Sequence, residues 1–158
     1  MNRFKFSILF PILTLNTSIS THTQAQIRNY LNELPQPKKD SIEQLYSRIL
    51  SQFPEIPISF SDGKNAEGRI VTNPSIGFGQ TQLAYADGSS KSIFKVGISS
   101  TKTGISIYFM GLSDKNFLKN RFQSQLGKAK ITGYCIAYKS LDSAQVDFLL
   151  AEILAFLQ

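Results

Sequence analysis

The hydrophobic pattern of this chain changes from helical spacing to strand alternation and back, and this change limits the fold more than any other feature. Apolar residues recur at helical spacing over residues 27–34 and 42–53, and again over 146–157 at the end of the chain. Between them, residues 104–110 alternate in side-chain type with a period of two, which is typical of a strand with one buried face. The pattern therefore predicts an α+β fold.

Capping and breaking residues set the limits of the predicted helices. Pro35 and Pro54 end the first two helices, and Asp40 followed by Glu43 predicts a capping-box start for the second. A third helix is expected to begin at Ser113-Asp114, to turn Phe117, Leu118 and Phe122 inward, and to stop at Gly127. The fourth begins near Asp142-Ser143.

Turn residues separate the predicted strands. The middle of the chain is rich in Gly, Pro, Asn and Ser, and the pair Asp87-Gly88 is typical of a hairpin turn. We predict strands over residues 68–72, 81–86, 94–98, 104–110 and 133–139. A chain of 158 residues forms one core. We therefore expect a single domain over residues 27–158, with an antiparallel-rich sheet flanked by N-terminal and C-terminal helices.

Residues 1–25 differ in composition from the rest. Arg3 and Lys5 precede a largely apolar stretch of ten residues, 6–15, and a polar stretch then leads to Ala25. This outline fits a secretory signal, although Pro11 interrupts it, and it is too short to span a bilayer. Three interpretations stay open: a signal peptide, a start assigned too early, and an apolar extension. The last two together favour the cytoplasm; export through a signal peptide ending near Ala25 is the alternative.

The charge of the chain suggests the kind of partner. The sequence has 17 Lys and Arg against 11 Asp and Glu, a formal charge of +6. Residues 88–140 hold nine of these cations and a single acid, Asp114. Such a bias attracts phosphates or an acidic partner over a Debye length of about 8 Å. Nucleic acid is disfavoured because the cations are not densely interleaved with aromatic residues.

Few residues are available for catalysis or metal binding. The only cysteine is Cys135 and the only histidine is His22, so an internal disulfide and a zinc site with several thiolates are excluded. No nucleophile–base pair is visible, which favours a protein that is not an enzyme. We expect Cys135 to be an inert thiol in an apolar layer, and we predict no cofactor and no metal site.

A series of short motifs resembles the YdhG-like family, small bacterial α+β domains of unknown function. The opening helix matches at Tyr30, Leu31, Leu34 and Pro35. The turn that follows the second helix matches at Pro74, Ser75, Gly77, Phe78 and Gly79. Later motifs match at Tyr85, Gly88, Gly97, Lys102, Tyr108, Leu126, Gly127, Lys128, Lys130, Cys135, Lys139 and Leu141. Ser100-Thr101 stands where the family has Pro-Arg, which puts any arginine-dependent role in doubt.

The resemblance implies a fold but no established reaction. One family member resembles frataxin and is regarded as an intracellular iron chaperone. Iron binding of that type relies on a ridge of carboxylates, whereas the N-terminal acids of this chain are sparse. The iron role therefore transfers poorly to this chain, and a frataxin-like iron chaperone is the alternative function.

We expect the principal function to be non-enzymatic binding of a small anionic ligand or an acidic partner. Tyrosine and lysine side chains of the predicted strands and turns are the candidates for a cationic, aromatic cleft. These are Tyr85, Lys95, Lys102, Tyr108, Tyr134 and Lys139. The other interpretation of the same residues is structural, with tyrosines at the edge of the core and lysines in solvent.

Overall fold

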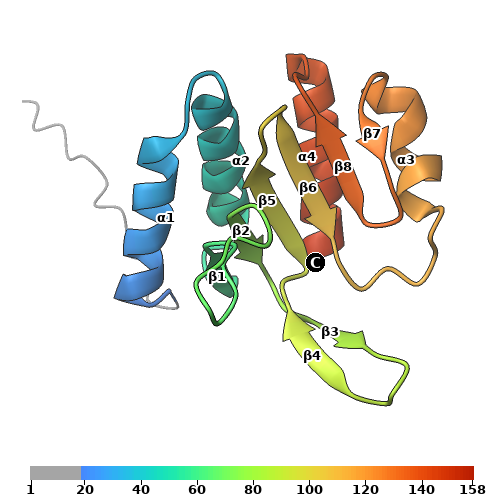
Figure 1. Cartoon of the computed structure of the whole chain (residues 1–158). Coiled ribbons are helices and arrows are strands. Elements are labelled where there is room, and N and C mark those ends of the chain that lie inside the picture. Colours follow the sequence, from blue (N-terminus) through green and yellow to red (C-terminus); the bar gives the residue numbers. More distant parts are fainter. Residues whose placement is uncertain (1–18) are drawn as a thin grey trace, which may run out of the picture.

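Six strands form one sheet in which every neighbouring pair is antiparallel (Figure 1). The computed structural model describes residues 19–158. The strand order is β1-β2-β5-β6-β8-β7. Their bounds are β1 Ile58–Ser61, β2 Ser75–Phe78, β5 Val96–Ser100, β6 Ile105–Phe109, β7 Lys130–Ile131 and β8 Cys135–Tyr138.

Two further strands form a separate hairpin. β3 (Thr81–Ala84) pairs with β4 (Ser90–Ile93) and with no other strand among the described residues. The hairpin projects from one end of the sheet (Figure 1). Its turn contains Gly88 at φ 84°, and the Asp87 side chain accepts a hydrogen bond from Ser89 N at 2.9 Å. The predicted Asp87-Gly88 hairpin is therefore confirmed.

The four helices lie against one face of the six-stranded sheet. They are α1 (Thr21–Glu33), α2 (Lys38–Gln52), α3 (Phe117–Leu126) and α4 (Ser143–Leu157). Each helix contacts a strand through a pair of aromatic rings. The ring centroids lie 5.4 Å apart for Tyr30 of α1 and Phe60, and 6.0 Å apart for Tyr46 of α2 and Phe78. Phe109 contacts both later helices, with its ring centroid 5.7 Å from that of Phe122 in α3 and 5.3 Å from that of Phe156 in α4. Because Phe60, Phe78 and Phe109 share one sheet face through the strand register, the helices form one layer over that face. The predicted α+β fold is confirmed.

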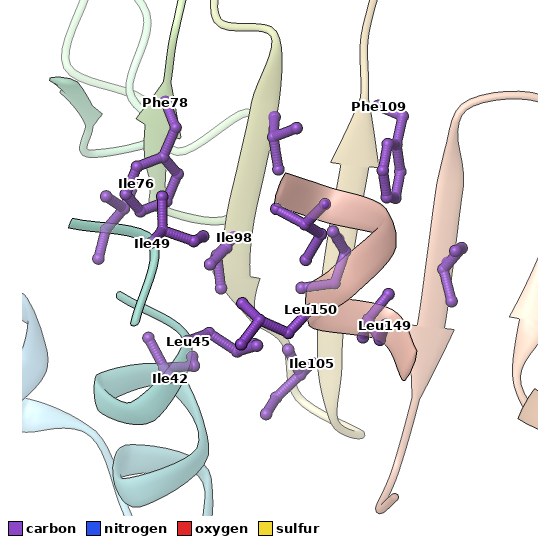
Figure 2. Close-up of a cluster of buried hydrophobic side chains, with 14 of the residues drawn as sticks. Ile42, Leu45, Ile49, Ile76, Phe78, Ile98, Ile105, Phe109, Leu149 and Leu150 are labelled. Atoms are coloured by element: carbon purple, nitrogen blue, oxygen red, sulfur yellow. The ribbon is translucent and has the colours of Figure 1, made fainter. Parts of the chain in front are cut away.

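The core lies between this helical layer and the sheet. Figure 2 shows Ile42, Leu45 and Ile49 of α2 meeting side chains of β2, β5, β6 and α4. The sheet contributes alternate residues of each strand, among them Ile98 and Ile105, which are 0% and 2% exposed. Burying each such side chain contributes about 1.5–3 kcal/mol. Hydrophobic burial therefore fixes which side of each strand faces the helices.

The opposite face of the sheet carries small and polar residues. In the register of β2, β5 and β6, Gly77 is paired with Gly97, and Ser99 with Ser106. Ser99 donates a hydrogen bond to the backbone oxygen of Pro74 at 2.6 Å and is fully buried. Among the described residues, no helix covers this face.

Several predicted elements differ from the structure. Residues 68–72 are not a strand but part of a loop in which the Asn65 side chain accepts hydrogen bonds from Glu67 N and Arg69 N. This side-chain turn competes with strand pairing. The strands β1, β2, β4 and β7 were not predicted, because each has only two to four residues and therefore too few for a clear alternation.

Two helix starts also differ from prediction. α1 begins at Thr21, earlier than the predicted stretch, because the Ser20 side chain accepts a hydrogen bond from Thr23 N at 3.1 Å. α2 begins at Lys38 after Pro37, with no side-chain cap, so the capping box predicted at Asp40 is wrong. Asp40 instead accepts a hydrogen bond from Gln36 at 2.9 Å.

The ends predicted for the later helices are closer to the structure. Asp142 caps α4, as the sequence predicted for the start of that helix, and the structure adds a capping box with Gln145. Gly127 ends α3. Phe117, predicted to face inward, is 38% exposed.

The predicted boundary near residue 25 falls within α1, between Thr21 and Glu33. Residues 1–18, which hold most of the predicted signal or extension, lie outside the described residues. Within residues 19–158, no helix is long and apolar enough to cross a membrane.

Candidate functional site

The six sequence-predicted site residues are spread over both ends of the sheet. Lys95 and Lys102 flank β5 (Val96–Ser100) at its two ends. Lys139 follows β8, whose last residue Tyr138 pairs with Ile105 at the start of β6. Lys102 and Lys139 are therefore at the same end of the sheet, and Lys95 is at the other.

Tyr85, Tyr134 and Lys95 lie away from the end of the sheet that holds Lys102 and Lys139. Tyr85 sits in the turn of the projecting hairpin and is 46% exposed. Tyr134 precedes β8, and its backbone oxygen accepts a hydrogen bond from Phe109 N at 2.8 Å. Lys95 extends over the ring of Phe156, with Nζ 5.5 Å from the ring centroid.

Tyr108 is the centre of a small polar group on the helix-free face. It pairs in register with Cys135. Burial raises the pKa of Tyr108, and the nearby Cys135 and Tyr134 raise it further, while Ser106 and Ser99 lower it by hydrogen bonding. Of the six predicted residues, the structure therefore brings Tyr108 and Tyr134 near one another.

Cys135 belongs to this group and not to an apolar layer. It is half-buried and faces away from the helices, beside Ser106, so the expectation of an apolar layer is wrong. Burial raises the pKa of Cys135, and this exceeds the lowering by Ser106 and Lys130. The thiol therefore stays protonated at neutral pH, which does not suit a nucleophile.

A cavity of about 180 Å³ lies at the other end of the sheet, between the start of α2 and the end of β8. We call it the α2–β8 cavity. Lys38, Ser41, Gln44 and Leu45 of α2 form one wall. Their spacing of three and four residues places them on one side of the helix. Pro37 completes this wall.

The other walls come from the sheet and from the segment that leads into α4. Ile105 and Tyr138 line the cavity from β6 and β8. Lys139, Ser140, Leu141 and Val146 close it on the remaining side. The cavity therefore joins residues from the two halves of the chain.

The electrostatics of the α2–β8 cavity favour an anion. It is lined by two lysines, Lys38 and Lys139, and none of its described lining residues is Asp or Glu. Lys38 Nζ is held in place by donating a hydrogen bond to the backbone oxygen of Thr101 at 2.6 Å. Two lysines that line one concave surface concentrate positive potential there.

The acids nearest in sequence to these walls are already engaged. Asp40 accepts a hydrogen bond from the Gln36 amide, and Asp142 accepts one from Gln145 N at 2.8 Å. Both side chains are absent from the cavity wall. The positive charge of the two lysines is therefore not neutralised within the cavity.

Tyr138 is the most buried polar side chain of the cavity. It is 8% exposed, and burial raises the pKa of its hydroxyl. Within residues 19–158 this hydroxyl has no hydrogen-bond partner, and burial is the single cause of its pKa shift. Buried polar groups normally have a partner.

A second cavity, of about 130 Å³, lies at the base of the hairpin beside Ser59, Gly79 and Phe94. Its described lining contains no charged side chain. It therefore lacks the groups that would recognise an anion. Among residues 19–158, no three His, Cys, Asp or Glu side chains gather closely enough to hold a metal ion.

Sequence reasoning found one residue of the α2–β8 cavity, Lys139, and missed Lys38 and Tyr138. Tyr138 falls within the strand predicted over residues 133–139, and Lys38 falls within no predicted element. A basic residue directly after a proline at a helix start was the available signal for Lys38, but its proximity to β8 is not visible in the sequence.

No protein-family model, no curated protein and no solved structure matches this chain. The resemblance to the YdhG-like family therefore stays a prediction, as does each function that it implies.

Proposed function

We propose that the protein is a non-enzymatic binding module for a small anionic ligand, which binds in the α2–β8 cavity. The observation that carries this proposal is that Lys38 and Lys139 both line the cavity, whose described lining contains no carboxylate. An anion between them gains charge-assisted hydrogen bonds, which are about twice as strong as neutral ones. The cavity of about 180 Å³ is smaller than typical ligand pockets of roughly 300–1,000 Å³, which supports a small ligand.

Calorimetric titration of the full chain with inorganic phosphate, acetate and butyrate tests this proposal. We expect at least one of these anions to bind. Lys139→Gln is expected to weaken that binding by roughly tenfold, since hydrogen bonds to charged groups contribute about 1.5–3 kcal/mol.

Lys91→Gln is the matched control, because it removes the same charge from the hairpin strand β4, where Lys91 is exposed. Equal weakening by both substitutions would indicate a general charge effect and contradict the proposed site. Absence of binding for every anion would overturn the proposal.

We also propose that the chain is a YdhG-like domain, on the support of the ordered motifs and the α+β fold. A frataxin-like intracellular iron chaperone is the alternative function. Anaerobic titration of the full chain with ferrous iron separates the two: stoichiometric iron binding would favour the alternative. An acidic protein partner also fits the excess of cations, and anion titrations would then show no binding.

The cytoplasm is the location we propose, with export as the alternative. Cleavage after Ala25 would remove the Ser20 cap and the first turn of α1, which supports retention of this segment. Intact-mass measurement on natively expressed protein tests it. A mass beginning at Gln26 in an exported fraction would contradict the proposal.

A further inference from the structure

The unpartnered hydroxyl of Tyr138 calls for a physical explanation. The side chain lines the α2–β8 cavity and lies opposite Ile105 in the register of β6 and β8. It is 8% exposed, and its hydroxyl has no hydrogen-bond partner within residues 19–158. A buried polar group without a partner destabilises a folded protein. A ligand in the cavity would supply the missing partner.

The hydroxyl of Tyr138 suits a ligand atom that accepts a hydrogen bond. Burial raises the pKa of Tyr138, so the phenol is neutral at physiological pH and has a proton to donate. Lys38 and Lys139 also only donate. Tyr138, Lys38 and Lys139 therefore suit one negatively charged oxygen centre.

Beside the polar Ser41, Gln44 and Ser140, the cavity has an apolar part, which argues against a small inorganic anion. Leu45, Ile105, Leu141 and Val146 line the same cavity. A hydrated phosphate would leave these side chains in contact with polar atoms. A short hydrocarbon tail would instead pack against these side chains and be removed from water, which is favourable.

We infer that the ligand of the α2–β8 cavity is a short-chain monocarboxylate, whose carboxylate accepts a hydrogen bond from Tyr138 and whose tail packs on Leu45, Ile105 and Val146. This inference rests on the proposed function, because it specifies the anion that the same cavity binds. Lys38 and Lys139 supply the countercharge. No covalent step is involved.

A chain-length series tests the tail. We expect calorimetric affinities of the full chain to rise from acetate to propionate to butyrate by about fourfold for each added methylene, because burying one CH₂ is worth about 0.8 kcal/mol. Inorganic phosphate is expected to bind more weakly than butyrate. Tighter phosphate binding, or affinity independent of chain length, would overturn the inference and leave the anion-binding proposal standing. Absence of binding by all four anions would overturn both.

The substitution Tyr138→Phe tests the hydroxyl. It is expected to lower butyrate affinity by roughly tenfold without lowering the midpoint of urea unfolding, because an unpartnered polar group is removed. Tyr46→Phe is the matched control, since Tyr46 is a half-buried tyrosine of α2 that does not line the cavity. Unchanged butyrate affinity in Tyr138→Phe, or an equal loss in Tyr46→Phe, would contradict the role of this hydroxyl.

Discussion

At the scale of single residues, two adjacent glycines make room for an aromatic ring on the helix-free face. Gly77 and Gly97 are register partners in β2 and β5. A Cβ atom at Gly97 would lie 2.5 Å from Cε2 of Phe94, and one at Gly77 would lie 2.6 Å from Phe94 Cβ. The ring of Phe94 therefore packs directly on the backbone of two strands.

We predict that Gly97→Ala lowers the free energy of unfolding by about 1–3 kcal/mol, because the added methyl overlaps the Phe94 ring. Urea denaturation measures the change. Gly133→Ala is the control: its Cβ would meet the backbone oxygen of Lys115 at 3.5 Å, an ordinary contact distance. Similar stability of the two variants would show that the ring moves aside freely.

A second prediction at this scale concerns Cys135. The side chain is half-buried beside Ser106 on the polar face. We therefore expect Cys135→Ser to change the free energy of unfolding by less than about 1 kcal/mol, since the new hydroxyl has a hydrogen-bonding neighbour. Thermal or urea unfolding checks this. A decrease of several kcal/mol in the free energy of unfolding would indicate instead that Cys135 lies in an apolar layer, as the sequence suggested.

At the scale of elements, the start of α4 depends on a reciprocal cap. Asp142 accepts a hydrogen bond from Gln145 N at 2.8 Å, and the Gln145 side chain accepts one from Asp142 N at 3.1 Å. This places Leu141 and Val146 on the wall of the α2–β8 cavity. The cap therefore supports both the helix and the candidate site.

We predict that Asp142→Ala destabilises the protein by about 1 kcal/mol, whereas Asp142→Asn has little effect, because asparagine caps helices as well as aspartate does. The midpoint of urea unfolding, with the slope compared between variants, measures both changes. If the asparagine variant lost as much as the alanine variant, the negative charge near the helix N-terminus would be the stabilising factor instead.

At the scale of the whole molecule, the centre of the six-stranded sheet is buried, whereas the separate hairpin of β3 and β4 is exposed. β5 and β6 have a paired strand on each side and carry the fully buried Ile98 and Ile107. The hairpin of β3 and β4 pairs only with itself among the described residues, and Gln82 and Lys91 are exposed. Isolated two-stranded hairpins are marginally stable.

We predict that amide hydrogens of β5 and β6 exchange with solvent at least roughly two orders of magnitude more slowly than those of β3 and β4. Hydrogen exchange followed by mass spectrometry of peptides from the full chain measures the difference. Equal protection of the hairpin would mean that another surface covers it in solution.

The elements that the sequence determined are those with a complete local pattern. The stripe of α4 and the alternation of β6 each place apolar residues on one side, and Leu150, Ile153, Ile105 and Ile107 are buried as that pattern requires. β2 (Ser75–Phe78) is buried at every position, so it shows no alternation. That β2 is a strand follows only from its pairing with β1 on one side and β5 on the other.

The candidate site was decided by the tertiary structure. The sequence identified basic and aromatic residues in the second half of the chain, and Lys139 is the one that lines the α2–β8 cavity. Lys38 reaches that cavity only because α2 packs over the sheet beside β5. Its Nζ donates a hydrogen bond to the backbone oxygen of Thr101. Local periodicity determines which side of an element faces the core, since that depends on its own side chains. Which elements become neighbours, and therefore which charges share a cavity, depends on packing between segments far apart in the chain.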